Sequence, residues 1–291
     1  MRLARITLLL TIILLFASQA FAAPTNAPQA KEVAVYGQRI HYLEAGSGPT
    51  VILLHGLGGS NQAWLANIGP LAEHFHVVVP DQIGFGKSDK PLVNYRIRTY
   101  VDFLDEFCKQ LKIERASLVG NSMGGWIAAA YTAAFPDRID KLILVDAAGY
   151  RPAKDVDTRT FYALNPTTRE GMKDLSAKVF YNKVFLTDAA IDRAMTARLS
   201  AGDGYTINSL IESIIRGEDF LDDTVKTIKR PTLIVWGRQD GLMPLAEGEH
   251  FKRDIAGSQM IVFDECGHVP NFEKAAEFNA AVIKFLSGSP Q

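Results

Sequence analysis

Cysteine is scarce in this sequence. The 291 residues include only Cys108 and Cys266. Two cysteines exclude a fold held together by disulfides and exclude a cysteine-rich zinc site. Nothing in the sequence brings the two thiols together, so we expect both to be free, although a secreted chain could bridge them. Hydrophobic residues make up 47% of the chain, so a packed core is expected to hold the fold.

An excess of charge of one sign is also missing, because 31 lysines and arginines face 32 aspartates and glutamates. A net charge of -1 excludes the basic surface of a nucleic-acid-binding protein and the polybasic surface that holds proteins on anionic membranes. Beyond the first 22 residues, no apolar run approaches the roughly 20 residues needed to span a bilayer. We therefore expect a small-molecule substrate, with no nucleic acid and no integral membrane segment in the mature chain. The oligomeric state is not predicted.

The N-terminus has the layout of a secretory signal peptide. Arg2 and Arg5 precede an apolar stretch over residues 6–17, and a small-residue Ala-Phe-Ala sequence ends at Ala22. A positive start, a short apolar core and a small-residue cleavage site are typical of such signals. The sequence therefore predicts cleavage near Ala22 and a periplasmic or secreted protein, with an uncleaved anchor as the alternative. Polar residues 23–31 are predicted to be a flexible lead-in.

Short apolar runs alternate with helical patterns along the rest of the chain. The runs are rich in β-branched residues, which is typical of strands buried on both faces of a parallel sheet. They cover 33–36, 39–43, 50–54, 76–79, 116–119, 141–145, 232–236 and 259–263. Helical patterns cover 97–111, 122–135 and 271–286. The sequence predicts an α/β fold with a mostly parallel eight-stranded sheet, a hairpin at one edge and helices on both faces.

One long segment breaks this alternation. Residues 151–230 contain no convincing buried strand but many helix-like apolar positions. We predict a helical cap there, inserted into a core made of residues 32–150 and 231–291. Insertions of this kind enter at the carboxyl ends of strands, where ligands bind. Trp126, Phe161 and Phe185 are candidate substrate-binding residues, although packing alone also accounts for such side chains.

The first chemical motif surrounds Ser122. Gly120 to Gly124 read Gly-Asn-Ser-Met-Gly, between a predicted buried strand and an alanine-rich helix. In this context a G-x-S-x-G motif forms a sharp turn that exposes the serine hydroxyl at the edge of the sheet. Ser122 is therefore the candidate nucleophile. A serine that merely caps the helix is the alternative.

A second motif, His-Gly-Leu-Gly-Gly, begins at His55. Such a loop supplies a backbone N–H to an oxyanion, and the second N–H comes from the residue after the nucleophile. We predict Leu57 and Met123 as the two donors, ahead of Gly58 and Gly59. The His55 side chain is expected to bond the loop backbone and not to contact substrate.

Two further motifs supply an acid and a base. Asp240 follows the strand candidate at 232–236, and His268 follows the one at 259–263. Asp240 would fix the tautomer of His268, which would take the proton from Ser122. Asp146, at the end of another strand candidate, is the alternative acid. A purely structural role, in which Asp146 caps a loop, is the other interpretation of this residue. Catalytic residues Ser122, Asp240 and His268 follow one another in nucleophile–acid–histidine order.

With these motifs, the chain resembles the α/β-hydrolase family of serine hydrolases over residues 32–287, outside the cap. It is most similar to bacterial extracellular lipases and esterases and to members like monoacylglycerol lipase. The resemblance rests on the segments Gly-Phe-Gly-Lys-Ser at 84–88, Asn-Ser-Met-Gly-Gly at 121–125, Val-Asp-Ala-Ala-Gly at 145–149 and Gly-His-Val-Pro at 267–270. It implies the same triad and cleavage of carboxylic esters through an acyl-enzyme, with no cofactor and no metal.

Neighbouring families differ at single positions. Haloalkane dehalogenases and epoxide hydrolases carry a carboxylate where this chain has Ser122. The meta-cleavage C–C bond hydrolases share the Asn-Ser-Met-Gly-Gly segment, but they usually have more glycine at the position of Leu57 and a tryptophan at that of Val269. C–C hydrolysis and lactone hydrolysis on the same triad stay open as alternatives. A non-catalytic binding protein is disfavoured, because an inactive scaffold would more often have lost a triad residue.

Overall fold

A computed structural model describes residues 27–288 of the chain. The predicted signal peptide at residues 1–22 lies outside the described residues. Within residues 27–288, no helix is both long and apolar enough to cross a membrane.

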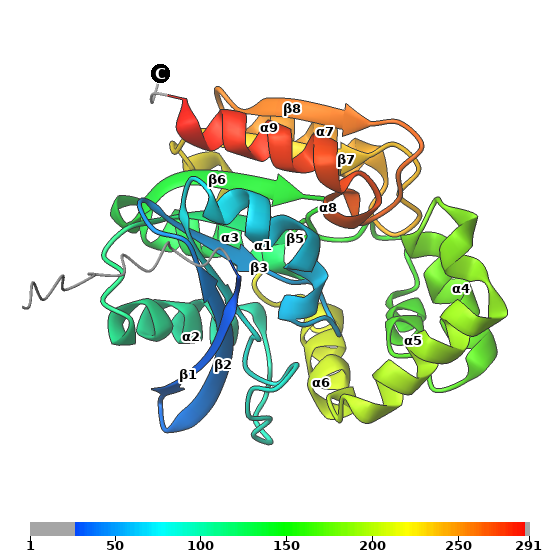
Figure 1. Ribbon diagram of the computed structural model, residues 1–291. Helices are drawn as coiled ribbons and strands as arrows, with labels where there is room; N and C mark the ends of the chain where they lie inside the picture. The colour runs from blue at the N-terminus through cyan, green and yellow to red at the C-terminus, as the bar shows by residue number, and fades with distance from the viewer. Residues whose placement is uncertain (1–26, 289–291) are drawn as a thin grey trace, which may run out of the picture.

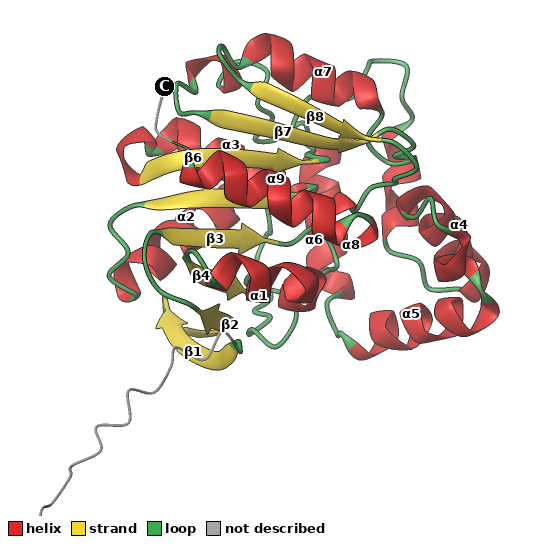
Figure 2. Cartoon of the chain, turned by 45° about the horizontal axis from the view of Figure 1, so that its top comes forward, coloured by secondary structure: helices red, strands yellow, loops and turns green. Residues whose placement is uncertain are grey.

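One eight-stranded sheet runs through the molecule, as predicted (Figures 1 and 2). Its strands are β1 (Gln29–Val35), β2 (Gln38–Ala45), β3 (Thr50–Leu54), β4 (His76–Pro80), β5 (Ala116–Asn121), β6 (Ile139–Val145), β7 (Thr232–Gly237) and β8 (Gln259–Phe263). They lie in the order β1-β2-β4-β3-β5-β6-β7-β8. The β1–β2 hairpin is antiparallel and joins β4 in antiparallel fashion, and all later pairs are parallel.

Helices cover both faces of the sheet (Figure 2). They are α1 (Leu65–Ala72), α2 (Ile97–Gln110), α3 (Met123–Ala134), α7 (Leu245–Asp254), the short α8 (Pro270–Glu273) and α9 (Ala275–Ser287). Successive strand residues point to opposite faces. Val51 and Leu53 of β3 therefore pack with α1 and α9, whereas Ile52 and Leu54 pack with α2 and α3. Both faces of the central strands are buried, which is why these strands read as continuous apolar runs.

The segment between β6 and β7 contains helices and no strand. Its helices are the 3-10 turns at Thr158–Leu164, Lys183–Leu186 and Val225–Thr227, together with α4 (Arg169–Val179), α5 (Asp188–Ser200) and α6 (Gly204–Ile215). Helix α6 packs into the main core through Ile207, Leu210 and Ile211. Helices α4 and α5 stand off the carboxyl ends of the strands, at the right of Figure 1. The outer part of this segment thus lies over the edge where the parallel strands end.

The structure differs from the sequence-based prediction at several element boundaries. The lead-in predicted for 23–31 extends too far, because Gln29 to Lys31 pair with Tyr42 to Glu44 in the hairpin. This edge strand is solvent-exposed at its start, so its polar residues look like a linker. The helix predicted over 271–286 is divided into α8 and α9 at Lys274, whose φ is -126°. The two helices α1 and α7 were not predicted.

Candidate active site

The carboxyl ends of neighbouring strands bring the predicted residues to one edge of the sheet. His55 follows β3, Ser122 follows β5, and Asp146 follows β6. The loops after β7 and β8 carry Asp240 and His268. In parallel sheets this edge is where ligands bind. The candidates therefore come from five different segments and meet at one place in the fold.

Ser122 occupies a strained turn between β5 and α3. Its φ of 55° and ψ of -119° place a non-glycine residue in a region that L-residues rarely adopt. Its N–H donates to Val145 O at 2.9 Å, which anchors the turn to β6. Room for the turn comes from Gly124, where a Cβ would lie 2.2 Å from Leu54 O. The turn leaves the Ser122 side chain partly exposed at the N-terminus of α3.

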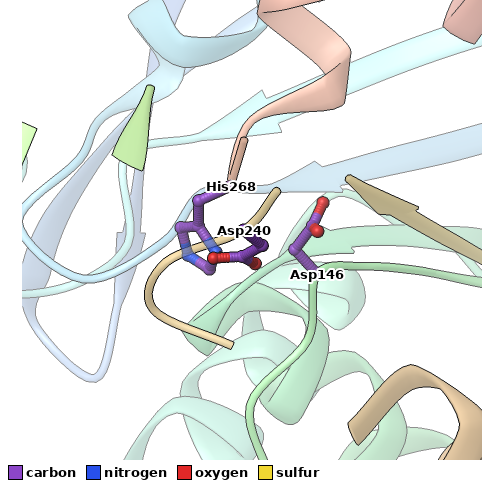
Figure 3. Close-up of side chains that lie close together, drawn as sticks. All are labelled: Asp146, Asp240 and His268. Atoms are coloured by element: carbon purple, nitrogen blue, oxygen red, sulfur yellow. The ribbon is translucent and has the colours of Figure 1, made fainter. Parts of the chain in front are cut away.

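Asp240 and His268 form a buried hydrogen-bonded pair. Asp240 Oδ2 lies 2.7 Å from His268 Nδ1, and their side chains are 0% and 6% exposed. The other oxygen of Asp240 accepts hydrogen bonds from the N–H groups of Leu242, at 2.7 Å, and Met243, at 3.0 Å. Figure 3 shows the Asp240 carboxylate against the ring of His268. The pair is held in the geometry that leaves the other ring nitrogen of His268 available as a base.

Asn121 links this pair to Ser122. Within residues 27–288, no hydrogen bond joins the Ser122 hydroxyl directly to His268. Instead, Asn121 Nδ2 donates to His268 O at 3.0 Å and to Val145 O at 3.2 Å. The residue before the candidate nucleophile thus ties the histidine loop to β5 and β6. The sequence analysis did not single out Asn121, although it stands inside the Gly-Asn-Ser-Met-Gly motif.

Asp146, the rival acid, is buried beside the pair. Asp146 Oδ1 accepts from Gly237 N at 2.8 Å, and Asp146 has a positive φ of 43°. Burial, with the charge of Asp240 as the next cause, raises the pKa of Asp146 well above its ordinary value. Among the described residues, Asp146 makes no hydrogen bond to His268, whose Nδ1 bonds to Asp240. Ligand atoms of Asp146, Asp240 and His268 lie within 4.8 Å of one another (Figure 3), but His268 Nδ1 is hydrogen-bonded to Asp240 at 2.7 Å, which suits proton transfer better than metal binding.

The loop after β3 is braced internally. His55 is fully buried; its Nδ1 donates to Gly56 O at 2.8 Å, and its Nε2 accepts from Gln82 N at 3.1 Å. Burial lowers the pKa of His55, which suits a neutral ring in this structural role, as the sequence predicted. Gly59 N donates to Gly56 O at 3.1 Å. Among the described residues, the N–H groups of Leu57, Gly58 and Met123 make no hydrogen bond, so all three are free for a ligand oxygen, whereas the Gly59 N–H is engaged by Gly56 O. The structure therefore disfavours Gly59 as a donor but does not separate Leu57 from Gly58.

The three candidate pocket residues lie in different surroundings. Trp126 is buried in the main core, where its indole N–H donates to Asp219 O at 2.9 Å and its ring stacks on Phe220. These contacts give Trp126 a packing role. Phe161 packs against the same core and is partly buried. Phe185 contacts Phe180, with ring centroids 4.8 Å apart. Within residues 27–288, no aromatic ring contact joins any two of these three side chains.

The two cysteines are both buried and both free, as predicted.

Comparison with known proteins shows that this chain is similar to hydrolases. A family profile described as alpha/beta hydrolase fold matches residues 49–275. A 2-hydroxy-6-oxononadienedioate/2-hydroxy-6-oxononatrienedioate hydrolase of Escherichia coli (strain K12 / DH10B) is 34% identical over 264 residues. This alignment covers 86% of the present chain and 91% of that relative.

Solved structures extend the similarity to two kinds of chemistry. The meta-cleavage product hydrolase of Pseudomonas fluorescens IP01 superposes with a TM-score of 0.81 at 30% identity, covering 88% of this chain and 97% of that one. A bacterial membrane phospholipase A gives a TM-score of 0.78 at 30% identity, covering 90% and 87%. A putative lipase of Acinetobacter baumannii gives 0.82 at 25% identity, covering 90% and 91%.

Proposed function

The chain belongs to the α/β-hydrolase family, and on that premise we propose that it is a serine hydrolase that cleaves carboxylic esters. The observation that carries the serine-hydrolase mechanism is the buried 2.7 Å hydrogen bond between Asp240 and His268. It stands beside a serine in a strained turn at a helix N-terminus. Such an arrangement activates a hydroxyl nucleophile.

In the proposed mechanism Ser122 Oγ attacks the ester carbonyl carbon while His268 takes the hydroxyl proton. The carbonyl oxygen becomes an oxyanion held by the N–H groups of Leu57 and Met123. His268 then gives the proton to the departing alkoxide, so the alcohol leaves and an acyl-Ser122 ester remains. Water, deprotonated by His268, releases the acid and restores Ser122. Asp240 stabilises the His268 imidazolium throughout, and no cofactor is needed.

An ester is favoured over a dicarboxylate by the charges beside the site. Arg198 of α5 reaches the loop after β3, which carries the predicted oxyanion donor Leu57. A Cβ at Gly58 of this loop would lie 2.5 Å from Arg198 Nη1. Its guanidinium is ion-paired with Asp203, whose side chain is 1% exposed. The pair presents no net positive charge to a substrate carboxylate. The similarity to a phospholipase and a putative lipase supports the same substrate class.

Hydrolysis of a C–C bond is the second candidate. The identity of 34% to the E. coli dienedioate hydrolase supports it, together with the fold similarity to a meta-cleavage product hydrolase. An enol-lactonase from Burkholderia xenovorans LB400 is also similar, with a TM-score of 0.78 and 25% identity. All three reactions would use Ser122 and His268, so the substrate distinguishes them and the triad does not.

The test is an assay of residues 23–291 beside the Ser122→Ala variant. The substrates are p-nitrophenyl butyrate, p-nitrophenyl laurate and a 2-hydroxy-6-oxo dienoate. Ester turnover that Ser122→Ala abolishes supports the proposal, and the ratio of the two ester rates measures the preferred acyl length. Turnover of the dienoate alone would replace the ester by the C–C substrate. Failure of a fluorophosphonate probe to label Ser122 would refute the serine-hydrolase mechanism itself.

We also propose export of the protein after cleavage near Ala22, on the signal-peptide layout of residues 1–22. N-terminal sequencing of the protein recovered from a periplasmic extract tests this proposal. A mature chain that still begins at Met1 would contradict it.

A further inference from the structure

The last turn of α4 is joined to both loops that carry the Asp240–His268 pair. Lys178 O accepts a hydrogen bond from Gly241 N at 3.0 Å, and Val179 O accepts from His268 N at 2.7 Å. The final carbonyl groups of a helix have no partner within the helix. Here the loops after β7 and β8 provide the missing donors. The backbone of the inserted segment therefore supports the acid loop and the histidine loop directly.

Glu273 closes the same junction from the other side. It ends α8, the four-residue helix that begins two residues after His268. Glu273 Oε2 accepts from Gly267 N at 2.7 Å and from Tyr181 N at 3.3 Å. Glu273 Oε1 accepts from Asn182 N at 2.7 Å. One carboxylate thus holds the residue before His268 and two consecutive residues of the segment that follows α4.

The chemistry of this junction requires a carboxylate. Three backbone N–H groups converge on the side chain at position 273. An ionised carboxylate offers two acceptor oxygens and no donor, whereas an amide would turn an N–H₂ group toward at least one of the three donors. The backbone at Gly267 also lies close to both partners, because a Cβ at this position would lie 2.3 Å from Val179 O and 3.0 Å from Glu273 Oε2. Glycine at 267 and glutamate at 273 fit each other.

We propose that Glu273 is a positioning residue that holds His268 in place by fastening its loop to the segment after α4. This inference rests on the proposed function, in which His268 is the base. It makes residues 178–182 a fixed support of the base and not a freely opening edge of the cap. A change at this junction is therefore expected to lower kcat, which depends on the position of the base, more than it changes KM.

The test compares Glu273→Ala and Glu273→Gln with Glu277→Gln as the matched control. Glu277 is an exposed acid one turn later, so its substitution removes the same charge without touching the junction. We expect Glu273→Ala to lower kcat and the rate of fluorophosphonate labelling of Ser122 by about tenfold or more, since small displacements of a catalytic group cost one to two orders of magnitude. KM should change by less than about threefold, Glu273→Gln should lie between the two, and Glu277→Gln should match wild type.

Amide hydrogen exchange provides a readout that does not depend on activity. We expect faster exchange in peptides covering 178–182 and 264–269 of both Glu273 variants, with no change elsewhere in the sheet. Should Glu273→Ala fail to fold, Glu273→Gln carries both measurements. Wild-type labelling rate and exchange in the folded variants would overturn the inference alone. A wild-type protein that is not labelled at Ser122 would instead overturn the proposed function, and this inference with it.

Discussion

Replacement of Asp240 by asparagine tests which of two buried acids serves His268. Asp240 Oδ1 accepts two backbone N–H groups, so the asparagine oxygen is expected to stay there. The amide N–H₂ group then replaces Oδ2, which lies 2.7 Å from His268 Nδ1. Two donors would face each other unless the imidazole moved its proton to Nε2. A ring protonated at Nε2 cannot accept the proton of Ser122, so kcat should fall by about 10⁴-fold.

Asp146→Asn is the matched control, since Asp146 is buried at the same edge but, in the described part of the chain, does not bond to His268. The asparagine oxygen can still accept from Gly237 N, which now bonds Asp146 Oδ1 at 2.8 Å. We expect kcat within about threefold of wild type, because the bond to Gly237 N is kept and the bond between Asp240 and His268 is not touched. The double variant should be no slower than Asp240→Asn. Initial rates of p-nitrophenyl ester hydrolysis measure all three. A large loss in Asp146→Asn with a small one in Asp240→Asn would reverse the assignment of the acid.

Three further predictions concern stability. Because its pKa is raised, Asp146 keeps a proton in the folded protein that the unfolded chain releases above about pH 4. Wild type should therefore lose stability relative to Asp146→Asn as pH rises, by up to about 1.4 kcal/mol per pH unit; urea midpoints that shift equally at pH 5 and pH 7 would contradict this. Gly124→Ala puts a Cβ 2.2 Å from Leu54 O. It should lower the free energy of unfolding by about 3 kcal/mol and abolish fluorophosphonate labelling of Ser122. Normal labelling would show that the turn adapts. Asp81→Ala removes the acceptor of Asn61 N and Lys87 N and should cost about 2 kcal/mol, which an unchanged thermal midpoint would refute.

The central strands and the turn at Ser122 are predictable because their causes are local. Strands buried on both faces must be apolar throughout, so β3 was predicted residue for residue and β7 to within one residue. The turn needs small residues at 120 and 124, and the spacing of a short motif records that need. The edges of the fold follow other rules. The exposed start of β1 is polar, so its pairing with β2 left no apolar signal.

The contacts that hold the site together are distant in sequence and leave no such signal. Asn121 bonds the backbone of His268, which lies 147 positions away. Glu273 bonds Asn182, which lies 91 positions away. In each case the partner is a backbone group, and every residue has one, so residue type does not reveal the pairing. Sequence reasoning therefore identified the groups suited to the chemistry but missed the side chains that position them.

The turn that carries Ser122 and the loop that carries His268 are supported by different parts of the chain. The turn at Ser122 is built within the core, from β5, α3 and their contact with β6. The backbone of His268 is held on one side by Asn121 of β5, and on the other side by Val179 of the inserted segment and, through Gly267, by Glu273. Exchange of residues 151–230 for the segment of a related hydrolase should then leave the strained serine intact but displace the histidine. Such a chimera is expected to lose turnover even on small esters that need no cap contacts, unless the new segment offers the same two carbonyl groups at its α4 end.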